Sequence, residues 1–279
     1  MKNSIFLLII TLMLTSCGSD KKNDLNRNIV LNDTITTPSG LKYIYLKEGS
    51  GQKVEDGSKI KAYTELYIND NPEVFWTTSG DKDSIFAFIH GKTSLIKGFS
   101  ELNSYLAEGD EVIALIPDSL AYGKQEKNGV PGGSTLIYNP YQVRYVSPPK
   151  ELLGDTLYNL ASTVNSKAAT DFYERILNSD LKNKYHTDIE DLSELVLNLN
   201  KATLYAESEE IAGYFLKKSN DKDVQQSFSF YKLLALESQS KFSEALVLVE
   251  PLAKQATNQE WWHNKMLELK TKVENDSSN

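Results

Sequence analysis

The sequence predicts an α+β domain followed by an all-α domain, and three observations lead to this prediction. Residues 37–147 contain short alternating runs of apolar and polar residues, Gly-rich turns, and one amphipathic stretch with helical spacing. Residues 150–279 keep a helical periodicity and contain almost no Gly or Pro. The pair Pro148-Pro149 separates these two textures. We therefore expect a curved antiparallel sheet wrapped on one short helix, followed by a helical, repeat-like domain.

Residues 1–16 are predicted to be a lipoprotein signal peptide. Residues 5–14 are almost uniformly apolar and follow the positive charge of Lys2. This run is shorter than the roughly 20 residues of a membrane-spanning helix, but it has the length of a secretory signal. It ends in Leu14-Thr15-Ser16-Cys17, which resembles the lipobox of lipoprotein precursors. Cys17 is therefore the predicted lipidation site, and the mature chain is expected to be lipid-anchored outside the cytoplasm, at the periplasmic face or in the outer membrane. The alternative is an ordinary signal peptide or membrane helix that happens to contain a Cys.

The composition excludes several classes of function. The formal net charge is −8 and no basic run is present, so we expect no nucleic-acid partner. Cys17 is the only Cys of the chain, and the three His residues lie far apart, so neither disulfides nor a metal site are expected. No phosphate-binding Gly loop or nucleophile elbow is present, and no cofactor is predicted.

The elements of the first domain follow from its local patterns. Residues 17–36 are polar and rich in Lys, Asn and Asp, which predicts a flexible tether. The spacing of apolar residues over 95–106 fits one face of a short helix. Alternation of β-branched and aromatic residues predicts strands at four places, namely 41–46, 59–69, 111–117 and 135–146.

Three motifs of this domain resemble those of a known family. Residues 115–123 read Leu-Ile-Pro-Asp-Ser-Leu-Ala-Tyr-Gly. Residues 86–99 contain Phe-x-Phe, then Gly, then Leu-Ile-x-Gly-Phe. Residues 39–43 read Ser-Gly-Leu-Lys-Tyr and are followed by Gly-Ser-Gly at 49–51. In this order and spacing, residues 37–147 resemble an FKBP-type peptidyl-prolyl cis-trans isomerase domain.

The resemblance implies an enzyme that needs no cofactor. Rotation about an amide has a barrier of about 18–20 kcal/mol because resonance must be broken. A catalyst needs a dry aromatic pocket for the proline ring and donors that favour the twisted amide. The resemblance assigns the floor to Phe99, a backbone N–H donor to Ile96 and a hydroxyl donor to Tyr122. The full set of site residues that it implies is Tyr63, Phe75, Phe86, Leu95, Ile96, Phe99, Tyr122, Val130 and Tyr138.

The sequence also departs from the family at the rim of this site. Trp76 stands where the family has an acid, and the arginine that often follows has no equivalent. The flap sequence Val130-Pro131-Gly132-Gly133 is expected to be more flexible than the family's Ile-Pro-Pro. We therefore expect isomerisation of X-Pro bonds in proline-containing segments of exported or envelope proteins, with weak catalysis. Two alternatives stay open, a non-enzymatic FKBP-fold adaptor in an envelope complex and a chaperone whose isomerase activity is secondary.

The second domain resembles tetratricopeptide repeats in a degenerate form. Residues 241–245 read Lys-Phe-Ser-Glu-Ala, and residues 208–212, 33 positions earlier, read Ser-Glu-Glu-Ile-Ala. Both segments are expected at turns between antiparallel helices, within a domain of six or seven helices. Stacked helices present concave surfaces to extended peptides, so we expect client or partner binding. A plain bundle that serves as spacer or dimerisation element is the alternative.

Overall fold

The computed structural model describes residues 27–78, 85–255 and 259–276. The predicted signal peptide, Cys17 and the first part of the predicted tether lie outside the described residues. The chain divides into two compact units, Met1–Pro148 and Pro149–Asn279. Each unit has its own buried core.

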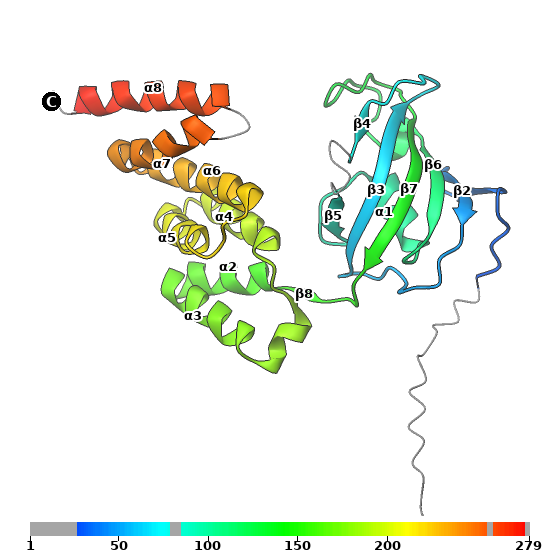
Figure 1. Cartoon of the computed structure of the whole chain (residues 1–279), viewed down its shortest axis with the longest axis horizontal. Coiled ribbons are helices and arrows are strands. Elements are labelled where there is room, and N and C mark those ends of the chain that lie inside the picture. Colours follow the sequence, from blue (N-terminus) through cyan, green and yellow to red (C-terminus); the bar gives the residue numbers. More distant parts are fainter. Residues whose placement is uncertain (1–26, 79–84, 256–258, 277–279) are drawn as a thin grey trace, which may run out of the picture. The chain divides into compact units, whose positions relative to one another are not determined.

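The first unit is built on one antiparallel sheet of seven strands in the order β1-β2-β6-β7-β3-β4, with β5 also paired to β3. One helix, α1 (Lys97–Ser104), packs on one face of this sheet (Figure 1). The predicted α+β class and all four predicted strands are confirmed. The strands are β1 (Thr34–Thr36), β2 (Lys42–Lys47), β3 (Lys59–Ile68), β4 (Trp76–Thr77), β5 (Phe86–Ile89), β6 (Glu111–Ile116) and β7 (Leu136–Val146).

The core of this unit lies between the sheet and α1. Successive side chains of a strand point to opposite faces, so every second residue of β6 is directed toward the helix. These residues are Val112, Ala114 and Ile116, and all three are fully buried. Gly98 lets the helix approach closely, since a Cβ at this position would lie 2.4 Å from Cγ2 of Ile116. The position of α1, and of the residues at its N-terminus, therefore depends on a missing side chain.

Two aromatic residues of β7 point into the same core although, in a regular strand, their spacing would place them on opposite faces. Tyr138 and Tyr141 are three positions apart, which would place them on opposite faces. The register of β7 shifts against both of its neighbours in this region. Both rings consequently pack on Phe99, with centroid distances of 4.8 Å for Tyr138 and 5.1 Å for Tyr141.

Part of the predicted tether is packed on the first unit. Arg27 donates to both oxygens of Asp110, at 2.6 and 2.9 Å, and the Asp110 side chain is fully buried. The same carboxylate accepts hydrogen bonds from the backbone N–H groups of Gly49 and Ala107. Residues 34–36 then form β1 along β2. The prediction of a flexible spacer up to Thr36 is therefore wrong for residues 27–36, which the ion pair and the strand pairing hold on the domain.

The second unit consists, in its described part, of seven α-helices and a short parallel strand pair. α2 packs on α3, α3 packs on α5, and from α4 to α8 each helix packs on the next; α2, α4 and α6 also pack in succession (Figure 1). Side chains cap two helix starts, because Asn165 accepts from the N–H of Ala168 and Asp221 from that of Val224. The elements are β8 (Glu151–Leu152), α2 (Leu153–Thr163), α3 (Ser166–Leu177), β9 (Tyr185–His186), α4 (Ser193–Lys201), α5 (Tyr205–Leu216), α6 (Lys222–Ser238), α7 (Phe242–Gln255) and α8 (Gln259–Asp276). None of the described helices combines the length and the apolar character needed to cross a bilayer.

The repeat-like segments of this unit lie inside helices rather than between them. Residues 208–212 belong to α5, and residues 242–245 form the start of α7. The connections come a few residues earlier, where Thr203 and Ser240 have positive φ angles of 62° and 57°. The 33-residue spacing still relates equivalent positions, because Ala212 and Ala245 are both fully buried. The assignment of these segments to turns was wrong, and the tetratricopeptide likeness stays a prediction.

Candidate active site

The first unit contains a cavity of about 960 Å³ between α1, the start of β4 and the loop that precedes β7. Eight of the nine predicted site residues line it, and Tyr63 does not. Its lining consists of Leu66, Phe75, Trp76, Phe86, Ser94, Leu95, Ile96, Lys97, Phe99, Asp118, Ser119, Ala121, Tyr122, Gly123, Lys127, Asn128, Val130 and Tyr138.

The deep part of the cavity is an aromatic cup. Phe86 and Phe88 are two positions apart on β5 and point to the same face, with ring centroids 5.1 Å apart. Phe88 is buried in the core beneath the cavity. Phe99 lies 5.9 Å from Phe86 and 4.8 Å from Tyr138, and only 2% of it is exposed. Trp76 closes the side with its ring edge-on to Phe86 at 5.9 Å. Such a cup excludes water and accepts an apolar ring of the size of proline.

Two hydrogen-bond donors border the cup. Ile96 is the N-cap of α1 and has extended backbone angles, so its carbonyl accepts from the N–H groups of Phe99 and Ser100. Within the described residues, neither the N–H of Ile96 nor the hydroxyl of Tyr122 has an acceptor. Burial, and to a smaller extent the neighbouring Tyr122, raises the pKa of Tyr138. The Tyr138 hydroxyl therefore stays protonated at neutral pH.

The outer wall is a short hairpin whose tip is Lys127-Asn128-Gly129-Val130. The backbones of Lys127 and Val130 exchange two hydrogen bonds of 3.0 Å each. Asn128 and Gly129 have φ angles of 55° and 76°, the positive values that the type I′ turn needs at both central positions. This turn buries Val130 to 3% exposure on the cavity wall. Phe75 lies against the tip, because a Cβ on Gly129 would be 3.7 Å from Cζ of the Phe75 ring.

The flap glycines serve close packing. A Cβ on Gly132 would lie 2.0 Å from the carbonyl oxygen of Lys124. The N–H of Gly133 donates to the carbonyl of Gly123 at 2.8 Å. The glycines on which the expected flexibility of this segment was based thus have a packing role. They allow residues 132–133 to lie close to residues 123–124.

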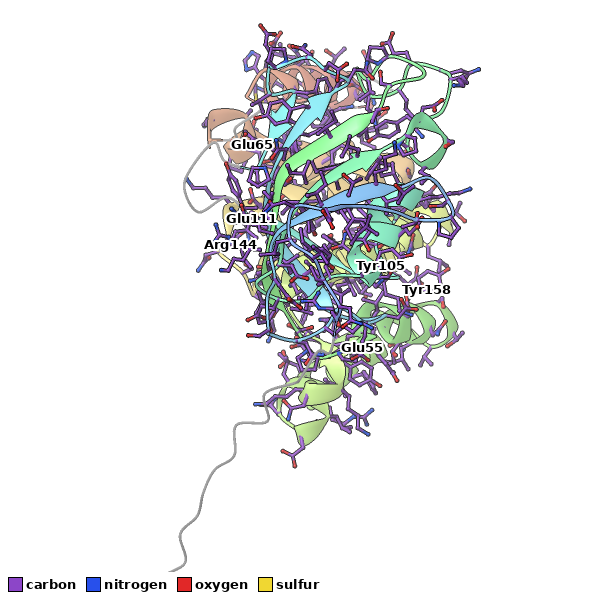
Figure 2. All side chains as sticks on the ribbon, turned by 90° about the vertical axis from the view of Figure 1, so that its right-hand side faces the viewer. Glu55, Glu65, Tyr105, Glu111, Arg144 and Tyr158 are labelled. Carbon is purple, nitrogen blue, oxygen red and sulfur yellow. The ribbon has the colours of Figure 1, made fainter. Side chains whose placement is uncertain are left out.

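Tyr63 is the predicted site residue that the structure places elsewhere. The inward residues of β3 are Ala62, Thr64 and Leu66, so Tyr63 points to the opposite face of the sheet. Its hydroxyl donates to Oε1 of Glu65 at 2.9 Å, and that of Tyr67 donates to Oε2 at 2.6 Å. Figure 2 labels Glu65 on this side of the unit. The prediction for Tyr63 was wrong because the match to the family fixed its position along the strand but not its face.

Several residues that line the cavity were not predicted from the sequence. Leu66 was detectable, because alternation from Ala62 places it on the inward face. Trp76 was noted only as a lost acid, whereas the structure uses it as a wall. Asp118 forms a 2.7 Å ion pair with Lys124, and this hydrogen bond lowers the pKa of the Asp118 carboxyl. No sequence pattern predicts the pairing of Asp118 with Lys124, because it depends on the conformation of the flap.

Comparison with known proteins finds similarity to one family, confined to the first unit. Residues 50–139 match the model of the FKBP-type peptidyl-prolyl cis-trans isomerases. Over 103 residues the chain is 29% identical to the FKBP-type peptidyl-prolyl cis-trans isomerase FkpA of Buchnera aphidicola subsp. Acyrthosiphon pisum, covering 37% of this chain and 41% of the relative. Over 107 residues it is 34% identical to FkpA of Buchnera aphidicola subsp. Baizongia pistaciae, covering 38% and 41%. The chain thus spans about two-fifths of the length of these curated relatives.

A solved structure aligns only weakly with this chain. The crystal structure of FkpA from Escherichia coli aligns with a TM-score of 0.38 at 23% identity, over 41% of this chain and 52% of that chain. The residues matched by the family model include every residue that lines the cavity. Residues 50–139 of the first unit thus match the FKBP-type peptidyl-prolyl cis-trans isomerase family.

Proposed function

We propose that the chain catalyses cis-trans isomerisation of X-Pro bonds at the cavity of its first unit. One observation carries the proposal, namely the aromatic cup of Phe86, Phe99 and Tyr138 beside two donors that have no acceptor among the described residues. The cup is apolar and the donors lie at its border. This combination suits a proline ring that is attached to a polar amide.

The mechanism follows from the difference between a planar and a twisted amide. Entry of the ring into the cup removes water from the peptide carbonyl, and loss of water weakens the polar resonance form. The N–H of Ile96 and the hydroxyl of Tyr122 are available to hold carbonyl oxygens while the C–N bond rotates. Catalysis then arises from tighter binding of the twisted amide, with no covalent step and no cofactor.

A second candidate function is a non-enzymatic adaptor that binds proline-containing segments. The observation in its favour is the rim, where Trp76 replaces the family's acid and Asp118 is engaged with Lys124. As an adaptor, the cup would bind the twisted and the planar amide equally well. Affinity for the peptide would then be retained, but isomerisation would not be accelerated.

A protease-coupled isomerisation assay on an X-Pro peptide separates the two candidates. We expect a rate above the uncatalysed one, a loss of about tenfold or more for Phe86→Ala, and a smaller loss for Tyr122→Phe. The matched control is Tyr63→Phe, which removes a hydroxyl on the other face of the sheet and should leave kcat/KM unchanged. A folded protein that binds the peptide without accelerating its isomerisation would establish the adaptor.

We further propose that the chain is an exported lipoprotein anchored through Cys17 and acts on envelope proteins. The residues Leu14-Thr15-Ser16-Cys17 support this proposal. Metabolic labelling with a radioactive fatty acid should mark the wild-type chain and leave Cys17→Ser unlabelled. Label on the variant would contradict the proposed site.

The helical unit is proposed to hold clients or a partner within an envelope complex. Its support is the succession of stacked helices, an arrangement that presents extended surfaces to peptides. The full chain and a form that ends at residue 149 should isomerise a short peptide equally well. Only the full chain should suppress the aggregation of an unfolded protein. Equal suppression by both forms would assign the helices to spacing or dimerisation instead.

A further inference from the structure

We propose that Lys97 and Lys127 make the cavity selective for proline-containing segments with an acidic residue next to the proline or two positions away. This inference rests on the proposed binding of proline at the cup and names the substrate class. It starts from the charges on the cavity lining, where two lysines and one aspartate are the ionisable side chains other than tyrosine among the residues that the structure describes.

Lys97 is the first residue of α1 and follows Ile96, whose N–H borders the cup. It is exposed, and no carboxylate of the described chain lies within ion-pair distance of its ammonium group. Glu101 is one turn further along the helix, but its carboxylate accepts hydrogen bonds of 2.9 and 2.7 Å from the Ser39 hydroxyl. The charge of Lys97 is therefore available to a ligand.

Lys127 occupies the tip of the flap on the other side of the cavity. Its backbone pairs with Val130, and residues paired directly across a hairpin project to the same face. Val130 is buried on the cavity wall, so the turn also directs Lys127 toward the cavity. Its ammonium group has no carboxylate partner in the part of the chain that the structure describes.

Asp118, the one acid among the described lining residues, does not cancel these charges. Asp118 is bound by Lys124 at 2.7 Å, and its side chain is only 18% exposed. The family's acid on the opposite wall is replaced by Trp76. The rim consequently carries an excess of positive charge, although the chain as a whole has a formal charge of −8. An acidic side chain close to the bound proline gains attraction there, whereas a basic one is repelled.

The size of the preference follows from the exposure of the lysines. Ion pairs at exposed positions change an equilibrium by about twofold to fivefold each. Salt screens such pairs, because the Debye length falls from about 10 Å at 0.1 M to about 3 Å at 1 M. We therefore expect a roughly fivefold preference for the acidic peptide at low ionic strength and nearly none at 1 M salt.

The test compares peptides that differ only in charge. One pair has Glu or Gln directly before proline, and a second pair has Glu or Gln two residues after it. Exchange between cis and trans is followed by NMR, which needs no coupling protease, and the Glu-to-Gln ratio of kcat/KM is recorded. In at least one pair the ratio should be about five for the wild type, and it should approach one for the double variant Lys97→Gln/Lys127→Gln.

The matched control is Lys92→Gln, because Lys92 is exposed close to α1 but does not line the cavity. It should keep the wild-type ratio. A second informative variant is Lys124→Gln, which releases the carboxylate of Asp118 and should lower the ratio without a change in the lining.

Failure of the inference is distinguishable from failure of the proposed activity. A wild-type ratio near one in both pairs, with both peptides isomerised, would overturn the charge preference and leave the isomerase intact. If neither peptide is isomerised, chemical-shift titration of the same peptides gives the ratio of dissociation constants. A ratio of about five that the double variant abolishes would still support the charge preference set by the two lysines, and a ratio near one would overturn it.

Discussion

The hydroxyl of Tyr141 donates a 2.7 Å hydrogen bond to Oδ1 of Asn103, in the buried layer between β7 and α1. Both side chains are completely buried, and the amide of Asn103 also donates to the carbonyl of Phe99 at 2.8 Å. The two bonds connect the sheet to the turn of the helix that carries the floor of the cup. A polar pair in this place fixes how α1 lies on the sheet, which apolar contacts alone leave less defined.

Removal of this hydroxyl should be costly. Tyr141→Phe leaves Oδ1 of Asn103 buried without a donor, and we expect a loss of about 1–3 kcal/mol in the free energy of unfolding. Urea unfolding measures it. In the double variant Tyr141→Phe/Asn103→Leu both partners are gone, so its loss should be smaller than the sum of the two single losses. Tyr145→Phe, at an exposed position of the same strand, is the control and should have little effect.

The Arg27–Asp110 ion pair predicts a large effect on stability. Arg27→Met leaves the buried carboxylate of Asp110 with its two backbone donors but no counter-charge, and we expect about 3 kcal/mol of destabilisation. Lys42→Met, on the exposed side of β2, should change stability by less than about 0.5 kcal/mol. Equal unfolding midpoints for the two variants would show that residues near 27 contribute no stability.

His90 predicts a pH dependence of stability. It is buried, its Nδ1 has no partner among the described residues, and its Nε2 lies 3.7 Å from Oδ1 of Asp56. Burial lowers the pKa of His90 below its ordinary value of 6.5, and Asp56 opposes this shift only in part. The unfolded chain therefore binds the proton more readily, and the folded state loses stability as the pH falls below about 6.5.

The measurement is the urea midpoint at pH 5 and pH 7.5. His90→Leu removes the titrating group, so the decrease between pH 7.5 and pH 5 should be smaller than in the wild type. The same substitution at His263, which is exposed on α8, should leave the decrease unchanged. A His90→Leu variant with the full wild-type decrease would assign it to other groups.

Two glycine substitutions should have opposite effects. Gly98→Ala forces a Cβ to within 2.4 Å of Cγ2 of Ile116 and 3.0 Å of Cβ of Leu120, so α1 must move outward. We expect a loss of about 1–3 kcal/mol together with reduced kcat/KM, because Ile96 and Phe99 move with the helix. Gly154→Ala, on α2, meets no atom closer than 3.9 Å and should stabilise by up to about 1 kcal/mol. Thermal unfolding and the isomerase assay check both changes, and an unaffected Gly98→Ala variant would contradict the packing argument.

The parts of the site that could be predicted are those that depend on local spacing. Phe86, Leu95, Ile96 and Phe99 lie within one strand-turn-helix segment, so their order along the chain is sufficient to bring them together. The strands were also predictable, because alternation is a property of each strand by itself.

The remainder depends on relations between strands that a single segment does not encode. Tyr63 was misplaced because one residue of offset exchanges the two faces of a sheet. The joint burial of Tyr138 and Tyr141 follows from register shifts against neighbouring strands. The two repeat-like segments were assigned to turns, since buried Ala residues at a constant spacing look alike whether they end a helix or lie within it.

The type I′ turn at Asn128-Gly129 has a consequence for how the specificity of this protein can evolve. The turn fixes the pairing of Lys127 with Val130, and the burial of Val130 holds the tip in place. The direction of the side chain at position 127 is therefore set by the turn and by the buried Val130, and it does not depend on which residue stands at 127. Position 127 can therefore exchange one charge for another without disturbing the fold, so under the proposed charge preference the peptide selectivity can change while stability is retained.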